Sequence, residues 1–254
     1  MTMPISPKRM PFMGHMAELR RRLFIVILVL GTLAIGLYFV SDQIYALLVG
    51  PAQDVIGSQG NFTFDVLEGM TNRFRLAVWA ALVLGSPVII YHALSFFVPA
   101  LKPKERRWFM WTFFAAVVLF IGGVAFCYLL ILAPSAEWLV QQNGETFDLM
   151  LRASSMMQFS MWFMVGFGVA FEVPIVVFYL VYFEVVPYKK LRQNWRTVWV
   201  VIIIVAAMIT PDWSPVSMAA LAGAMVGLFE GSMALVRIML RKRIRAQKLE
   251  LDED

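Results

Sequence analysis

The chain of 254 residues is 60% hydrophobic and only 15% charged, and its formal net charge is +5. Soluble domains carry about 25% charged residues, so this composition excludes an ordinary soluble protein and favours membrane spans. The basic balance is also found in nucleic-acid-binding proteins, but here the basic residues cluster between long apolar runs, which argues against that class.

Six apolar segments predict an all-α protein with six transmembrane helices. The domain covers residues 1–236, a charged tail covers 237–254, and the expected spans are 23–40, 76–98, 108–133, 156–183, 197–209 and 215–236. The first four spans reach the ~20 residues that a helix needs to cross a bilayer. Three arginines precede the first run, as in a secretory signal, but the run is too long for one and no small-residue cleavage site follows it. We therefore expect that the first span is retained.

The loops between these spans differ in basic residues. The N-terminal segment, the loops after the second and fourth spans, and the tail hold 19 of the 22 lysines and arginines. The opposite loops hold only Arg73, Arg75 and Arg152. Basic loops stay in the cytoplasm, which predicts a bacterial cytoplasmic (inner) membrane protein with both termini inside.

Two outer loops, 41–75 and 134–155, mix aromatic and aliphatic residues with polar ones and are expected to form a structured cap. Within the first loop, residues 42–49 predict a short amphipathic helix at the membrane surface, with Pro51 ending it.

The fifth span is unusually short. Its 13 residues, 197–209, cover only about 20 Å as a helix. Either the last two helices form a short hairpin that thins the bilayer, or they extend into flanking polar residues with Trp195 and Trp199 as interface anchors.

Catalytic and metal-binding motifs are missing from the sequence. His15 and His92 are far apart, no HExxH or phosphate-binding loop occurs, and the single Cys127 excludes a thiolate cluster. We therefore expect no enzyme, no cofactor and no bound metal.

Two isolated carboxylates stand in the basic cytoplasmic segments. Glu18 precedes the first span and Glu105 lies in the loop after the second. Each either pairs locally, Glu18 with Arg22 and Glu105 with Lys102 or Arg106, or faces a shared groove that binds cationic side chains.

Two further glutamates fall inside spans. Glu172 is followed by Pro174, which cannot donate a hydrogen bond to the carbonyl of Ala170, so the helix should open beside the carboxyl group. Ionisable groups at this depth are usually functional. Glu230, in the last span, is expected to reach the cytoplasmic interface or Arg237.

Three glycines, Gly223, Gly227 and Gly231, form a stripe of small residues along the last helix. Such stripes let helices approach closely. The stripe serves either packing within the bundle or docking of a separate helix.

Taken in order, several stretches resemble the TatC family, the core membrane component of the twin-arginine protein translocase. The resemblance runs from about His15 to Val236 and rests on HMAELRRRL (15–23), FFVPAL (96–101) followed by ERR (105–107), Gly122, Phe126, Tyr128 and Pro134, FGVAFEVP (167–174), TPD (210–212) and LFE (228–230).

The resemblance implies a concave, glove-like bundle with a short final hairpin. It also implies a receptor that binds twin-arginine signal peptides of folded cargo, recruits TatA and TatB, oligomerises in the membrane lipid and uses the proton-motive force. By position, the signal-peptide site of the family corresponds to Glu18, Arg20, Phe96 and Glu105 in this chain. The intramembrane glutamate of the family corresponds to Glu172. The partner-docking region would contain Thr210, Asp212, Met218, Gly223, Gly227 and Glu230.

One departure and two alternatives remain. Where the family usually has Ser-Gln, this chain has Ser217-Met218, which weakens the carry-over to Met218. Glu172 and Glu230 would also suit a proton-coupled transporter of small solutes, although no internal repeat is evident. A purely structural scaffold would need the glycine stripe but no acidic rim.

Overall fold

The computed structural model describes residues 12–56, 65–97, 109–142, 152–183, 185–210 and 214–239. The regular elements there are helical: α1 (Phe12–Tyr38), α2 (Ser41–Ile56), α3 (Glu68–Leu84), α4 (Ser86–Phe97), α5 (Phe109–Phe126), the π-helix η3 (Cys127–Ile131), α6 (Leu132–Gln141), α7 (Ala153–Ala170), α8 (Val173–Tyr182), α9 (Tyr188–Gln193), α10 (Trp195–Ile209) and α11 (Pro215–Met239).

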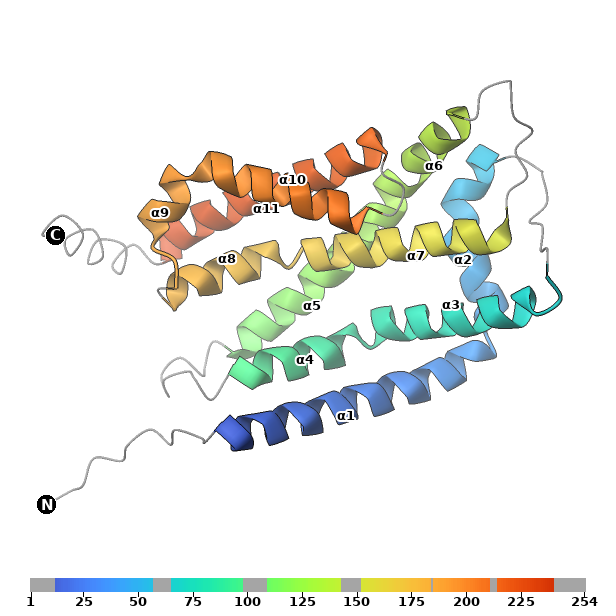
Figure 1. Cartoon of the computed structure of the whole chain (residues 1–254), viewed down its shortest axis with the longest axis horizontal. Helices are drawn as coiled ribbons and strands as arrows, with labels where there is room; N and C mark the ends of the chain where they lie inside the picture. The colour runs from blue at the N-terminus through green and yellow to red at the C-terminus, as the bar shows by residue number, and fades with distance from the viewer. Residues whose placement is uncertain are drawn as a thin grey trace, which may run out of the picture.

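These helices make six passes along the long axis of the molecule: α1, α3–α4, α5–η3–α6, α7–α8, α10 and α11 (Figure 1). Among the described residues, four continuous stretches are long and apolar enough to cross a membrane, α3 and α4 form a fifth candidate that is bent by 55°, and α10 is a shorter apolar helix. The chain is therefore a multi-pass membrane protein, and the expected all-α fold is confirmed.

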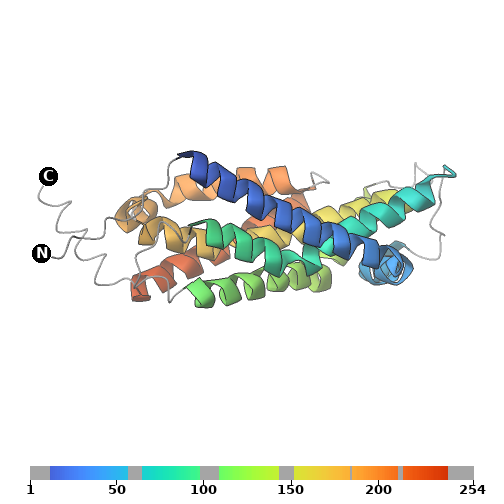
Figure 2. The same ribbon diagram turned by 90° about the horizontal axis from the view of Figure 1, so that it is seen from below.

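The final hairpin is asymmetric. α10 has 15 residues, as expected of a short helix, whereas α11 has 25 and does not break at Glu230. The end of α10 and the start of α11 stop short of the end of the molecule at which α6 ends and α7 begins (Figures 1 and 2). Within α11, Glu230 forms an ion pair with Arg192 of α9.

The prediction that Pro51 ends the first cap helix is wrong, because α2 continues through it to Ile56. Proline cannot donate to the carbonyl four residues earlier, which here belongs to Leu47. The Tyr128 hydroxyl donates to that carbonyl instead, at 2.8 Å. A side chain from another pass thus satisfies the acceptor that the proline leaves free.

The third pass also extends further than predicted. Residues 134–141 were expected to lie in an outer loop, but they form most of α6. The π-helix just before Pro134 explains this: the Leu132 N–H bonds back five residues to the Cys127 carbonyl. A wider turn of this kind accommodates the proline without ending the helix.

The principal core lies where α7, α8, α10 and α11 meet the third pass, around Phe163, Phe167 and Phe229. A separate apolar groove of about 400 Å³ opens between α1, α2, α3, α5 and α7, with Leu37 and Trp79 among its lining residues. The groove gives the bundle a hollowed, lipid-compatible face.

Candidate functional site

Glu18, Arg20, Phe96 and Glu230 lie toward one end of the bundle. The start of α1, the ends of α4, α8 and α11, the short helix α9 and the start of α10 all lie there (Figure 1). We call this the basic end, because its described residues include Arg20, Arg21, Arg22, Lys189, Lys190, Arg192, Arg196 and Arg237. The opposite cap end is formed by α2, α6 and the starts of α3 and α7.

Glu18 lies in the first part of α1 and pairs with Arg22 one turn later. The Arg22 Nε and Nη2 atoms both donate to Glu18 Oε1, at 3.0 and 2.5 Å. The Glu18 side chain is only 24% exposed. The local pair considered from the sequence is therefore present, and the second carboxylate oxygen is not used by Arg22.

The Glu18–Arg22 pair faces α4. α1 packs against α3 and α4, and Arg22 is close enough to His92 for its charge to act on the imidazole. His92 Nδ1 is buried and has no hydrogen-bond partner among the described residues. Phe96 follows one turn later on the same face of α4 and is half-buried. No sequence pattern pointed to His92 as a site residue, because its nearness to Arg22 depends on how α1 packs on α4.

The remaining residues of the predicted signal-peptide site, Arg20 and Glu105, are not seen in a shielded setting like that of Glu18. Arg20 is on the exposed side of α1. Glu105 lies outside the described residues, and so does the pairing that was considered for it with Lys102 or Arg106.

Glu172 occupies a break in the fourth pass. α7 ends at Ala170, α8 begins at Val173, and the Glu172 N–H bonds only three residues back to Val169. One carboxylate oxygen, Oε1, is buried without a hydrogen-bond partner among the described residues. The opening beside Pro174 that the sequence predicts is thus present in the backbone.

Glycines bring α5 and α7 close together just before this break. A Cβ atom at Gly123 would come within 2.6 Å of the Phe167 carbonyl oxygen and 2.8 Å of Phe171. A Cβ atom at Gly168 would meet the Phe120 ring at 2.9 Å. The glycine of the FGVAFEVP stretch, Gly168, therefore allows α7 to cross α5 at close range.

At the α10–α11 turn, polar side chains bond to nearby backbone. The buried Thr210 hydroxyl donates to the Ala206 carbonyl at 3.1 Å, and the Ser217 backbone N–H donates to the Ser214 hydroxyl at 3.1 Å. Met218 is half-buried on α11, and Asp212 lies outside the described residues. Met218 therefore places an apolar side chain where the family resemblance leads one to expect glutamine.

The glycine stripe of α11 does not pack inside the bundle. A Cβ atom added at Gly223, Gly227 or Gly231 would meet nothing within 4 Å. The opposite face of α11, which includes Leu221, Met225 and Phe229, is the buried one. Of the two roles considered for the stripe, packing against the described part of the bundle is therefore excluded.

Glu230 pairs across helices rather than along its own. Arg192 Nη1 of α9 donates to Glu230 Oε2 at 2.7 Å. The predicted partner Arg237 forms no ion pair among the described residues. Of the two alternatives considered for Glu230, the pair with Arg237 is therefore not formed, because Arg192 of α9 pairs with the carboxylate instead.

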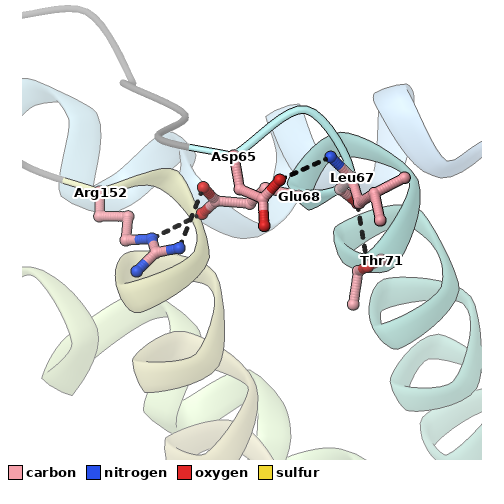
Figure 3. A network of polar contacts seen from close by, with 5 residues as sticks. All are labelled: Asp65, Leu67, Glu68, Thr71 and Arg152. Carbon is pink, nitrogen blue, oxygen red and sulfur yellow. Dashed lines mark hydrogen bonds and ion pairs between the residues drawn. The ribbon is translucent and has the colours of Figure 1, made fainter.

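The cap end contains an ion pair between a buried carboxylate and a half-exposed guanidinium, which sequence reasoning missed. Arg152, at the start of α7, donates from Nε and Nη2 to the two oxygens of Glu68 at 2.8 and 3.2 Å (Figure 3). The Glu68 side chain is only 5% exposed, and its hydrogen bond and negative charge raise the pKa of Arg152 above the ordinary value. The sequence did contain a clue to this pair, since Arg152 is one of only three basic residues in the loops expected to face the outside.

The start of α3 is fixed by nearby contacts. The Asp65 carboxylate accepts the Leu67 N–H at 3.1 Å, and the Thr71 hydroxyl donates to the Leu67 carbonyl at 2.9 Å (Figure 3). A second ion pair, Arg73–Asp42 at 2.9 Å, joins α3 to α2 but is exposed. Together these contacts hold the cap helices on the membrane passes.

Within the part of the chain that the structure describes, no group of three or more His, Cys, Asp or Glu residues could hold a metal ion. The fold and the two ends therefore define a multi-pass membrane protein with paired charges at both ends and an isolated carboxylate within its fourth pass.

Comparison with known proteins identifies the family. The sequence profile of "Sec-independent protein translocase protein (TatC)" matches residues 14–223. The chain is 32% identical to the TatC protein of Deinococcus radiodurans, over 90% of this chain and 86% of that protein. It is 27% identical to the chloroplastic TATC protein of Pisum sativum, over 91% and 65%. The chain belongs to the TatC family, and it is a membrane component of the Sec-independent protein translocase.

Solved structures agree with this assignment. A crystal structure described as the twin arginine translocase receptor TatC superposes with a TM-score of 0.76, at 24% identity, covering 88% of this chain and 98% of that one. A second, of TatC in the detergent DDM, gives 0.74 at 25% identity, covering 87% and 98%. The glove-like six-helix fold is shared with these structures.

Proposed function

We propose that this chain is the twin-arginine signal-peptide receptor and core scaffold of a Tat translocase, and that it exports folded proteins. In this proposal residues 1–236 form the membrane domain, residues 237–254 form a cytoplasmic tail, and the basic end faces the cytoplasm. The clustering of 19 of the 22 basic residues in the expected cytoplasmic segments supports that orientation.

The observation that carries the proposal is the environment of Glu18. Its carboxylate is three-quarters shielded, and Arg22 donates to only one of its oxygens. A guanidinium from a visiting peptide binds a carboxylate through a planar fork that lysine lacks. Partial shielding makes such a charged hydrogen bond stronger than an exposed ion pair.

The neighbouring groups have supporting roles in the proposal. Phe96 supplies an apolar wall one turn beyond His92, Glu105 supplies the carboxylate for the second arginine, and the exposed Arg20 contacts the peptide backbone. Together these residues select a pair of arginines rather than a single cation.

The test is photo-crosslinking of an Arg-Arg signal peptide to the purified protein, with a Lys-Lys peptide as comparison. We expect that Glu18→Gln weakens Arg-Arg binding about tenfold, which is about 1.4 kcal/mol. Glu137→Gln is the matched control, because Glu137 is an exposed carboxylate at the cap end. Arg22→Gln removes the internal competitor for Glu18 and should preserve or tighten binding.

Two outcomes would contradict this assignment. One is equal binding of the two peptides by the native protein. The other is unchanged Arg-Arg binding in a variant with both Glu18→Gln and Glu105→Gln.

We further propose that single-span partners of the TatA and TatB type dock on α10 and α11, that the proton-motive force drives export, and that several copies assemble in the membrane. The outward-facing Gly223 and Gly227 support a docking helix, since no described residue lies within 4 Å of a Cβ atom added at either position. Thr210, Asp212, Met218 and Glu230 flank that surface in the proposal, and the unpaired carboxylate of Glu172 is its intramembrane polar group.

A further inference from the structure

A cavity of about 340 Å³ lies at the basic end, between α9 and the last turns of α11. Its polar lining consists of Tyr188, Arg192, Glu230 and Arg237, and Met233 and Ile238 are among its apolar walls. Neither the family resemblance nor the proposed signal-peptide site includes Tyr188, Arg192 or Arg237.

The charges that line the cavity are unevenly paired. Arg192 and Glu230 form one ion pair at 2.7 Å, in which the Arg192 side chain remains 57% exposed. Arg237 forms no ion pair, and the Tyr188 hydroxyl no hydrogen bond, with any described residue. Among the described residues, the cavity therefore contains one positive charge without an ion-pair partner and one hydroxyl group without a hydrogen bond.

The cavity lies at the membrane surface. Tyr188 and Arg192 belong to α9, a six-residue helix without buried residues that joins two membrane passes. At the start of α10, Trp195 and Trp199 pack edge to face with ring centroids 4.8 Å apart, and the Arg196 guanidinium lies 5.3 Å from the Trp195 ring centre. Tryptophan and arginine in this arrangement are typical of the headgroup region.

The apolar wall of the cavity continues onto the outer surface of α11. Ile238 lines the cavity yet is 70% exposed, and Leu235, one turn earlier, is 49% exposed. A ligand with a charged head and a hydrocarbon tail fits this arrangement. Its head would lie in the cavity, and its tail would lie along the apolar surface of α11. A free anion or an acidic peptide would leave this apolar surface without a partner.

We propose that this cavity binds the phosphate headgroup of an anionic phospholipid. Arg237 and the Tyr188 hydroxyl hold the phosphate, and Arg192 is shared between the phosphate and Glu230. Basic pockets between helices on the cytoplasmic side of membrane proteins suit such headgroups. This inference needs only a chain that spans the membrane, and it is independent of signal-peptide binding.

The test is titration of the purified full chain in detergent with phosphatidylglycerol or phosphatidylcholine, with bound lipid counted by native mass spectrometry. We expect one saturable phosphatidylglycerol site and weaker, non-saturating binding of phosphatidylcholine. Arg237→Gln should weaken phosphatidylglycerol binding about fivefold, as expected for one basic residue near an anionic lipid surface. Arg237 is exposed, so this variant should fold normally.

Two further variants sharpen the result. Lys190→Gln is the matched control: it removes the same charge from an exposed position on α9 that does not line the cavity, and should change affinity less than twofold. Glu230→Gln removes the competing carboxylate and should tighten lipid binding severalfold, the opposite sign to Arg237→Gln.

Three outcomes would overturn the proposal. The first is equal binding of the two lipids. The second is an equal loss in Lys190→Gln and Arg237→Gln, which would reduce the effect to general surface charge. The third is displacement of the lipid by millimolar inorganic phosphate, which would identify a site for free anions.

Discussion

At the scale of single residues, Tyr128 explains how a proline can lie inside a cap helix. Its hydroxyl donates to the Leu47 carbonyl, the acceptor that Pro51 leaves without a helical partner. The tyrosine reaches α2 from the π-helical turn of the third pass, so the contact also ties the cap to the membrane passes.

The first prediction is Tyr128→Phe, which keeps the ring and removes the donor. We expect the free energy of unfolding to fall by about 1 kcal/mol, the usual worth of one hydrogen bond. The measurement is unfolding by sodium dodecyl sulfate in mixed micelles, followed by circular dichroism. Tyr45→Phe is the control, because the Tyr45 hydroxyl has no hydrogen-bond partner among the described residues. Equal effects in the two variants would contradict a specific role for the Leu47 contact.

The second prediction concerns the Glu68–Arg152 pair. Glu68→Gln should lower the free energy of unfolding by about 1–3 kcal/mol, since it weakens two hydrogen bonds of a buried group. Arg152→Gln should destabilise more, because it leaves a carboxylate buried and uncompensated.

The same unfolding assay tests this order, with Arg73→Gln as the control because its partner Asp42 is 72% exposed. A larger loss in Arg73→Gln than in Glu68→Gln would refute the view that burial makes the Glu68 pair important.

At the scale of helices, α5 and α7 cross closely beside the break that contains Glu172. Gly123 and Gly168 allow it, because each occupies a point where a side chain would meet the other helix. The crossing lies just before the point where α7 ends at Ala170 and the fourth pass breaks. The position of the intramembrane carboxyl group thus depends on glycines from two passes.

The third prediction is that Gly123→Ala destabilises the bundle by about 1–3 kcal/mol, the usual cost of overpacking. Its methyl group would meet the Phe167 carbonyl oxygen at 2.6 Å, and backbone cannot move aside easily. Gly122→Ala is a matched control on the same helix, because nothing lies within 4 Å of its Cβ position. Thermal unfolding in detergent should leave Gly122→Ala unchanged or slightly raised, and equal losses in the two variants would contradict the crossing.

At the scale of the whole molecule, long apolar segments and basic-loop asymmetry predicted the helical class and the six passes. These features are local, so a sequence displays them directly. The ends of α2 and α6 were misjudged because Tyr128 and the π-helix, which let these helices continue, act through tertiary packing and backbone geometry. Sequence rules treat each proline alone and therefore place a helix end there.

The candidate site was predictable to a similar extent. Glu18 and Glu172 stood out because charges are rare near apolar segments, and the structure gives both a distinct setting. The surroundings of His92, Glu68 and Arg192 come from partners at least 38 residues away in the chain, as in the Arg192–Glu230 pair. Glu105 and Asp212 remain predictions, since they lie outside the described residues.

The shortness of α10 has an electrical consequence. Fifteen residues rise about 22 Å, compared with a hydrocarbon core of about 30 Å. Where lipid conforms to the outer surface of this helix, the insulating layer is thinner, and the same transmembrane voltage falls over a shorter path. The local field is then about a third steeper than elsewhere in the membrane, so a charge moving beside α10 gains the same total energy over a shorter displacement.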